Sequence, residues 1–355
     1  MFDAAGQDLG RLDPLLNRWL VGYDPAGRRT LTIDPRGARV TYIFDKAGQQ
    51  IRELRSDRTR VTSSYDPAGR RTLMYDSTGP TGTVFDAAGQ ALSVTQPVNK
   101  RMTYVYDAAS RRRRVVDPDG GKTTYLHDPA GQLSVLIDPR GKRTSFAYDG
   151  AGREVGKTVA AAARVTQVFD PAGQLLEVVT RVASGVLRRL SLSYDGASRR
   201  VGQAASDGTK TAWVFDPAGR LTGENRTGSN PLSLAHGYDP AGNRTSVVDG
   251  GTLTTYLVDA ANRLVGEVSG GARTTYQNDA AGNRLTKETA IAVTYYTWDA
   301  VSRLAAAEPI GGLVSFVYNG DGRRVSKQVG GDTTQYVWDF EKVLQEADGS
   351  GATER

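Results

Sequence analysis

The 355-residue sequence contains no cysteine, only two histidines and no apolar run of 18 or more residues. Without cysteine there is no disulfide framework and no cysteine-ligated zinc or iron–sulfur centre. Without a long apolar run there is no membrane-spanning helix. Phe and Trp are scarce, at 8 and 4 residues, and only 39 % of the residues are hydrophobic, which is lean for one compact core. The lack of cysteine fits both the cytosol and the cell exterior.

Lysine is also scarce, since it supplies nine of the 45 basic residues, and arginine carries the net charge of +6. A basic protein invites a nucleic-acid interpretation. The arginines recur at a fixed spacing instead of gathering in one patch, which indicates architecture and argues against nucleic acid as a partner. The start of the chain, Met1–Gly6, has neither a basic nor an apolar segment, so no signal peptide is predicted.

An internal repeat runs through the whole chain. Turn aspartates recur every 20 or 21 residues, with longer intervals of 25 after Asp170 and 23 after Asp216, and Asn319 replaces one of them. The preceding residue is Phe, Tyr or Trp in fourteen of the seventeen copies, and the third residue after the aspartate is Gly in twelve. We therefore expect a single array of about 17 copies over residues 1–355, cut within a repeat at both ends, with no separate cargo or core domain.

Each of these aspartates begins a predicted tight turn, as in the run Asp66-Pro67-Ala68-Gly69. The carboxylate can accept a hydrogen bond from the backbone two residues on, Pro presets the negative φ of a type I turn, and Gly takes the left-handed position. This predicts a hairpin closed by a type I turn and a G1 bulge. The predicted turn residues are Asp24, Gly27, Asp66, Gly69, Asp128, Gly131, Asp170, Gly173, Asp216, Gly219, Asp239 and Gly242.

The aromatic residues that precede the turns are expected to pack between strands, because a fixed slot beside a turn indicates inter-strand packing. Rings exposed on a sheet could instead stack on sugars. The predicted packing aromatics are Tyr23, Phe44, Tyr65, Phe85, Tyr106, Tyr148, Phe169, Tyr194, Phe215, Tyr238, Trp298, Tyr318 and Trp338.

A second turn signal lies half a period later in many copies, as in Asp34–Gly37 and Asp138–Gly141. The segments between turns alternate as half-buried strands and are rich in β-branched and aromatic residues. The expected fold class is all-β, built from tandem 20–21-residue antiparallel β-hairpin repeats. Roughly 34 strands would form one continuous sheet, which must curl because twist accumulates.

The motifs Tyr23-Asp24-Pro25-Ala26-Gly27-Arg28 and Tyr148-Asp149-Gly150-Ala151-Gly152-Arg153 resemble the YD repeats of RHS proteins, and the pattern covers essentially the whole chain. The resemblance implies a strip of hairpins that spirals into a hollow shell, as in insecticidal toxin complexes, bacterial RHS effectors and teneurins. It further implies part or all of a shell that encapsulates a polypeptide such as a toxin for secretion or delivery. The implied location is secreted or at the cell surface.

No catalytic residue, metal site or cofactor is predicted, so the chain is expected to be non-enzymatic. His127 fills an aromatic slot, His236 alternates within a strand, and neither has a second ligand at metal spacing. Toxin-type RHS shells carry a self-cleavage site whose letters resemble Asp34–Gly37 and Asp138–Gly141. Both tetrads lie at regular half-period turns, so self-cleavage is not carried over.

The densest basic run, Arg111–Arg114, could touch phosphate or an acidic glycan. Alternate side chains of a strand face opposite sides, which favours solvated arginines or ion pairs with turn carboxylates. The alternative function is an extracellular adhesion or carbohydrate-binding surface. The expected partners are an encapsulated polypeptide or a neighbouring shell segment, with an acidic glycan under the alternative and self-association through edge strands.

Overall fold

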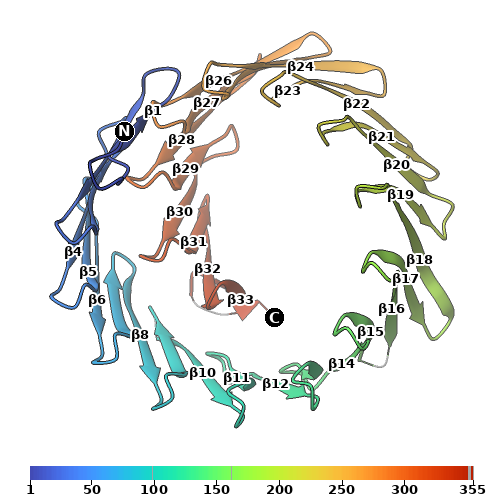
Figure 1. Ribbon diagram of the computed structural model, residues 1–355, viewed down its shortest axis with the longest axis horizontal. Coiled ribbons are helices and arrows are strands. Elements are labelled where there is room, and N and C mark those ends of the chain that lie inside the picture. Colours follow the sequence, from blue (N-terminus) through green and yellow to red (C-terminus); the bar gives the residue numbers. More distant parts are fainter. Residues whose placement is uncertain (98, 161, 351–352, 355) are drawn as a thin grey trace. The chain divides into compact units, whose positions relative to one another are not determined.

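The structure is a computed structural model that describes residues 1–97, 99–160, 162–350 and 353–354. Every regular element in this part of the chain is a β-strand, and the 34 strands belong to one sheet (Figure 1). None of the described residues forms a helix that could cross a membrane. The prediction of an all-β fold made of antiparallel hairpin repeats is confirmed.

The chain divides into two compact units, and the boundaries between them fall inside β10 and β24. Unit 1 combines a first segment, Met1–Thr103, with a return segment, Leu257–Arg355, and unit 2 is Tyr104–Tyr256. The strands up to the first boundary are β1 (Gly10–Leu12), β2 (Arg18–Tyr23), β3 (Arg29–Ile33), β4 (Arg39–Phe44), β5 (Gln50–Arg55), β6 (Arg60–Tyr65), β7 (Arg71–Asp76), β8 (Gly79–Phe85), β9 (Ala91–Gln96) and β10 (Lys100–Tyr106).

The strands between the two boundaries are β11 (Arg112–Val116), β12 (Lys122–His127), β13 (Leu133–Ile137), β14 (Arg143–Tyr148), β15 (Glu154–Val159), β16 (Ala163–Phe169), β17 (Leu175–Val182), β18 (Gly185–Tyr194), β19 (Arg200–Ala205), β20 (Lys210–Phe215), β21 (Leu221–Thr227), β22 (Leu232–Tyr238), β23 (Arg244–Asp249) and β24 (Thr252–Val258). Those of the return segment are β25 (Leu264–Ser269), β26 (Ala272–Asn278), β27 (Arg284–Glu288), β28 (Val293–Trp298), β29 (Leu304–Glu308), β30 (Val314–Tyr318), β31 (Arg324–Val329), β32 (Asp332–Asp339), β33 (Lys342–Asp348) and β34 (Thr353–Glu354).

From β1 to β10, from β11 to β24 and from β25 to β34, each strand pairs antiparallel with the next one in the chain. In the β2–β3 hairpin, Gly22 pairs with Leu31 but Tyr23 pairs with Arg29, so Thr30 is an extra residue and forms a bulge. The same shift recurs beside the other turns that follow even-numbered strands. This second bulge was not predicted, because its extra residue varies in type from copy to copy.

The alternating strand direction gives the ribbon two distinct edges. Loops after even-numbered strands contain the repeated aspartates and form the aspartate-turn edge. Loops after odd-numbered strands are the predicted half-period turns and form the half-period edge. The two edges therefore carry different chemistry along the whole chain.

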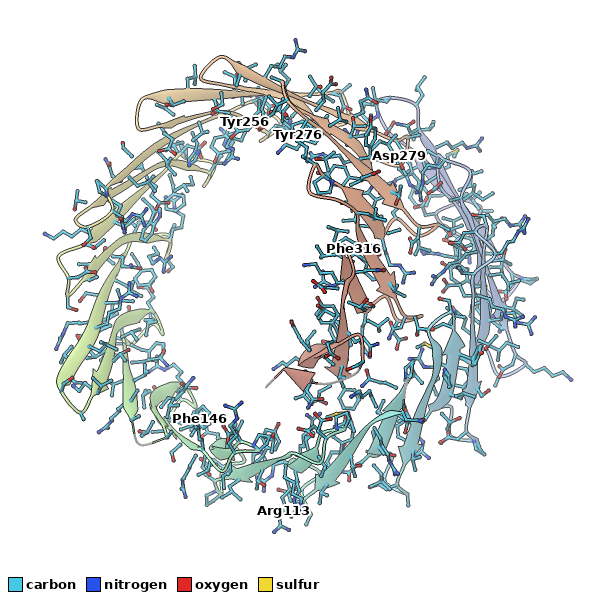
Figure 2. All side chains as sticks on the ribbon, turned by 180° about the vertical axis from the view of Figure 1, so that it is seen from behind. Arg113, Phe146, Tyr256, Tyr276, Asp279 and Phe316 are labelled. Atoms are coloured by element: carbon cyan, nitrogen blue, oxygen red, sulfur yellow. The ribbon has the colours of Figure 1, made fainter. Side chains whose placement is uncertain are left out.

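Unit 2 is a single curved layer with two different faces. Residues that pair across neighbouring strands, and residues two apart within one strand, lie on the same face of a sheet. The strand pairings of unit 2 therefore place one row of side chains on a single face. Figure 2 shows Phe146 and Tyr256, two members of this row, on the concave side and Arg113 on the convex side. The row consists of Tyr125, Phe146, Gln167, Leu192, Trp213, His236 and Tyr256.

In unit 1 the return segment lies beside the first segment (Figure 1), and this overlap buries side chains that a single layer leaves exposed. Val337, two residues before its turn aspartate, is only 3 % exposed. Val168 and Val214 occupy the same repeat position in unit 2 and are 50 % and 59 % exposed. The core of the molecule is therefore local, and it is thickest where two passes of the ribbon meet.

The two passes meet edge to edge, because half-period turns of the first segment contact aspartate turns of the return segment. The guanidinium of Arg36 donates to the carbonyl of Asp299 at 3.3 Å and to Oγ of Ser302 at 3.0 Å. At the next half-period turn, the carboxylate of Asp57 accepts a hydrogen bond from the N–H of Ala300.

The same alignment continues at the following turns. The buried carboxylate of Asp76 accepts a hydrogen bond from the N–H of Gly320. The side-chain amide of Gln96 donates to the carbonyl of Trp338 at 2.7 Å and accepts from its N–H at 3.1 Å. These partners are 242 to 266 residues apart in sequence, and successive turns of one edge meet successive turns of the other.

Gly320 is required by the closeness of this contact. A Cβ atom at this position would lie 2.7 Å from Cγ1 of Val61 and 2.8 Å from Sδ of Met74, both of which are buried. Asp321, the next residue, forms an ion pair with Arg71 at 2.7 Å. The aspartate turn thus rests directly on the first segment.

We expect Gly320→Ala to loosen the return segment, because the added methyl group overpacks the contact and costs about 1–3 kcal/mol. The matched control is Gly150→Ala, which changes the same repeat position at a turn where a Cβ would meet nothing within 4 Å. Thermal unfolding should show a lower Tm for Gly320→Ala and an unchanged or slightly higher Tm for Gly150→Ala. Equal Tm values for the two variants would contradict the close contact.

Candidate functional site

The aspartate turn is a small, fully hydrogen-bonded structure that recurs along one edge. In the turn that begins at Asp66, Oδ1 accepts from the N–H groups of Ala68 and Arg70, both at 3.0 Å. The N–H of Gly69 donates to the Asp66 carbonyl at 2.9 Å, and the Asp66 N–H donates to the Arg70 carbonyl at 3.0 Å. This is the bond pattern of a type I turn with a G1 bulge.

The third residue after the aspartate has a positive φ in every copy except the one at Asp339, where Phe340 has it. Gly27, Gly69, Gly131, Gly173, Gly219 and Gly242 have φ values between 77° and 89°. Where glycine is missing, Ser110, Ser198, Asn262 and Ser302 adopt the same left-handed conformation, with φ between 61° and 63°. Such φ values are uncommon for residues with a Cβ, so the rest of the turn must compensate for their cost.

An arginine four residues after the aspartate joins one turn to the next. Nε of Arg70 donates to Oδ2 of Asp66 at 2.6 Å, and its Nη1 donates to the carbonyl of Asp86, in the next turn, at 3.0 Å. The same guanidinium lies 4.9 Å above the ring of Phe85. The link to the next turn and the cation–π contact also occur together at Arg28, Arg153, Arg199, Arg220 and Arg303.

Where the aromatic residue is tyrosine, its hydroxyl makes a polar link of its own, both after a glutamine and after Arg220, where Tyr238 donates to Leu221. The hydroxyl of Tyr65 donates to the carbonyl of Gln50, in the preceding repeat, at 2.9 Å. Tyr148 and Tyr194 donate in the same way to Leu133 and Leu175. In the sequence, glutamine stands four residues after the aspartate in five copies, and the aromatic slot of the next copy is Tyr each time. Apart from the first copy, four aromatic slots hold Phe, and the copy before each of them has arginine at that position.

The thirteen aromatics predicted to pack lie at or next to the end of the incoming strand of their hairpins, and all are half-buried. Two tryptophans among them use the indole N–H in place of a hydroxyl. Nε1 of Trp298 donates to the carbonyl of Arg284 at 2.7 Å, and Nε1 of Trp338 donates to that of Arg324 at 2.9 Å. Where the slot holds tyrosine or tryptophan, ring packing is thus combined with a hydrogen bond to the neighbouring repeat, as at Tyr65 and Trp298.

A second aromatic column, three residues before each aspartate, was missed by the sequence analysis. It is aromatic in ten copies, and in unit 2 it forms the row on the concave face. Arginines five residues after an aspartate stack on it, as Arg200 does on Trp213 at 4.6 Å and Arg244 on Tyr256 at 4.9 Å. Counting aromatics at every position of the period would have revealed this column.

One ring of this column in unit 1 is strongly held. Arg284 lies 4.1 Å above Tyr276. Burial, together with a hydrogen bond from its hydroxyl to Glu267, raises the pKa of Tyr276 to about 12. This tyrosine therefore stays neutral and acts as a donor.

The basic run and the half-period turns lie where the repeat puts them. Arg111 donates to Asp107 at 2.8 Å, and Arg112 lies 5.0 Å from the Tyr104 ring centre. Arg113 is exposed on the convex face (Figure 2). In the tetrads Asp34–Gly37 and Asp138–Gly141, each aspartate accepts the N–H two residues on at 2.9 Å, as in an ordinary turn.

The described residues hold no group of three or more His, Asp or Glu side chains that could bind a metal ion. His127 ends β12 opposite Leu133, and His236 lies in β22 opposite Val247. Nδ1 of His236 is buried without a hydrogen-bond partner, on the concave face. The candidate functional features are therefore surfaces: the two edges and the concave aromatic face.

The sequence matches the family described as RHS Repeat over residues 85–122, 106–141 and 127–165. Residues 85–165 carry RHS repeats. This confirms the resemblance to YD-repeat proteins, and the aspartate turns that begin at Asp86, Asp107, Asp128 and Asp149 lie within the matched residues. No curated protein matches the sequence.

Solved structures with a similar fold are assemblies of toxin-complex proteins. The crystal structure of TcdB2-TccC3-TEV has a TM-score of 0.78, over 98 % of this chain and 23 % of that chain, at 15 % identity. TcdB2-TccC3 without its hypervariable C-terminal region and the Photorhabdus luminescens Tc holotoxin pore both have a TM-score of 0.66, over 95 % of this chain and 23 % of theirs, at 15 % identity. The chain thus spans 23 % of the length of these chains and shares their fold.

In several aspartate turns the carboxylate is stabilised in its charged form. Hydrogen bonds from the backbone N–H and the guanidinium of Arg70 lower the pKa of Asp66 below its ordinary value of 3.8, although partial desolvation opposes the shift. Arg28, Arg199 and Arg220 lower the pKa of their turn aspartates for the same reasons. Protonation would remove the charge that strengthens these hydrogen bonds and would replace one acceptor position by an O–H donor.

We therefore predict that the RHS chain loses stability in acid. A pKa that is lower in the folded state stabilises the fold above the unfolded value, near 3.9, and this stabilisation is lost as the pH falls through the folded value. The Tm, followed by circular dichroism, should stay level from pH 7 to pH 5 and drop between pH 4 and pH 2. A Tm that stays level down to pH 2 would contradict the role of the carboxylates.

Proposed function

We propose that this RHS chain is a non-enzymatic wall segment of a hollow β shell that encloses a polypeptide such as a toxin. The single array of about 17 repeats over residues 1–355 and a location outside the cell or at its surface belong to the same proposal. The observation that carries it is the edge-to-edge docking of ribbon passes, because a wall needs both lateral extension and closed edges. The fold shared with toxin-complex proteins supports it.

A wall of this kind extends copy by copy. Neighbouring repeats are linked through arginine, tyrosine or tryptophan side chains, so an added repeat finds bonding partners in the one before it. Docking of one pass on the next covers strand ends and loops that would otherwise remain exposed. Such a wall needs no thick hydrophobic core, which agrees with the low aromatic and apolar content.

The concave face of unit 2 is the surface that we assign to the enclosed polypeptide. Its row offers large rings, among them Phe146, Trp213 and Tyr256, and arginines stacked on two of them. Rings and guanidinium groups bind many different unfolded segments because they demand little geometry. The convex face presents Val168 and Val214 next to glycines such as Gly223, and has no comparable row of rings.

The second candidate is a surface that binds acidic carbohydrate. The observation that favours it is the stacking of arginines on rings of the concave face, which combines a sugar platform with positive charge. Binding of this kind would fall steeply with salt. Binding of an unfolded neutral polypeptide would be much less sensitive to salt.

We predict that the full chain binds a permanently unfolded probe, such as reduced and carboxymethylated α-lactalbumin, and that Trp213→Ala weakens binding about fivefold or more, as expected for a large aromatic contact. The matched control is Val214→Ala, which changes the neighbouring residue on the opposite face, where the side chain is 59 % exposed. Fluorescence anisotropy of the labelled probe gives the Kd, and circular dichroism verifies the fold of each variant.

The two candidate functions give different results in the same assay. Equal effects of Trp213→Ala and Val214→Ala, or no binding of the probe, would contradict the assignment of the concave face. Salt-sensitive binding of an acidic polysaccharide together with failure to bind the probe would favour the carbohydrate-binding surface.

A further inference from the structure

The half-period edge of the return segment carries exposed apolar side chains. Ile291, in the turn between β27 and β28, is 88 % exposed, and Ile310, in the turn between β29 and β30, is 75 % exposed. The next half-period turn presents the exposed Asp332. Two isoleucines at successive loop tips are costly in water, which indicates an interaction surface.

The same edge is already a binding surface one pass earlier in the ribbon. In the first segment, Asp57 and Asp76 accept N–H groups from aspartate turns of the return segment, and Val61 and Met74 pack against Gly320. The occupant of a half-period edge in this molecule is therefore an aspartate-turn edge. The return segment presents the corresponding half-period edge with its apolar tips exposed.

The complementary edge is also present in an exposed form. In the docked turn that begins at Asp299, the first two residues after the aspartate, Ala300 and Val301, are half-buried. The corresponding pairs of the first segment, Pro25–Ala26, Lys46–Ala47, Pro67–Ala68 and Ala87–Ala88, are all exposed. Unit 1 thus contains one docked and one exposed half-period edge, and one docked and one exposed aspartate-turn edge.

We propose that the half-period edge of β27–β30 binds the aspartate-turn edge of β2–β9 in a second copy of this chain. The contact is head to tail, so that copies stack as the two passes stack within unit 1, and a contact of this type can continue from copy to copy. Ile291 and Ile310 would be covered by the turns of the second copy, and Asp332 would accept a backbone N–H. The inference rests on the proposed wall function and names the partner and the surface.

The sequence of the aspartate turns adds a requirement. The residue directly after the aspartate donates its N–H in the docked turns, where it is Ala300 or Gly320. In the exposed edge of the first segment, Pro25 and Pro67 have no N–H to donate, whereas Lys46 and Ala87 have one. Ala87 is therefore a donor that we assign to the contact.

Sedimentation velocity of the full chain over a range of concentrations tests this assembly. We expect reversible association, which the double variant Ile291→Asp/Ile310→Asp weakens at least about tenfold. Ala87→Pro should also weaken it, since proline already occupies this position at residues 25 and 67 and removes only the N–H. The matched control is the double variant Val168→Asp/Val214→Asp, which adds the same two charges in unit 2 at side chains that are 50 % and 59 % exposed on a sheet face.

A mixture of the isoleucine double variant with Ala87→Pro distinguishes a head-to-tail contact from other modes of association. The first variant retains an intact aspartate-turn edge and the second an intact half-period edge, so the mixture should form dimers but no assemblies of three or more copies. A wild-type chain that stays monomeric at every concentration, or association that survives the isoleucine substitutions, would overturn the inference. Either result would leave the probe-binding test of the concave face unaffected, so failure of this contact is distinguishable from failure of the proposed function.

Discussion

The carboxylate that begins each aspartate turn is the constraint on which the rest of the structure depends. One oxygen accepts two backbone N–H groups and fixes the bend, and the other holds the side chain four residues later. When that side chain is arginine, it reaches the next turn and stacks on the next ring. A local turn is thereby converted into a link between repeats, and a chain with a thin core obtains its cohesion from neighbour to neighbour.

The links between repeats explain two types of junction, one with arginine and one with glutamine four residues after the aspartate. An arginine supplies both the cation–π contact and the hydrogen bond, so the next aromatic can be phenylalanine. A glutamine has no guanidinium group to stack on the next ring, although its side-chain amide also lies beside the next turn, and tyrosine adds a bond through its own hydroxyl. With neighbours held in this way, the edges of the ribbon remain as the sites of further interaction. The two passes of unit 1 dock through these edges. The proposed wall and the proposed association of copies extend the same contact.

Much of the fold could be predicted from the sequence, because the determinants of each hairpin lie within one period. Aspartate, a residue able to adopt positive φ and an aromatic at fixed offsets define the turns and the strand direction. The bulge opposite the turn could not be predicted, since no residue type marks it. The docked edges could not be predicted either, because Asp76 and Gln96 are ordinary turn residues whose partners are more than 240 positions away. Gly320 gave only a weak signal, since other turns also have glycine at that position.

The most direct test of the link between repeats is a double-mutant cycle at one junction, read as free energies of unfolding. Arg70→Gln removes the bond to the Asp86 carbonyl and a cation–π contact worth about 0.5–1 kcal/mol. Phe85→Tyr adds the hydroxyl that bonds the neighbouring repeat at Tyr65 and Tyr238, so the double variant should be about 0.5–1.5 kcal/mol more stable than Arg70→Gln alone. A double variant that is no more stable than Arg70→Gln would contradict the account.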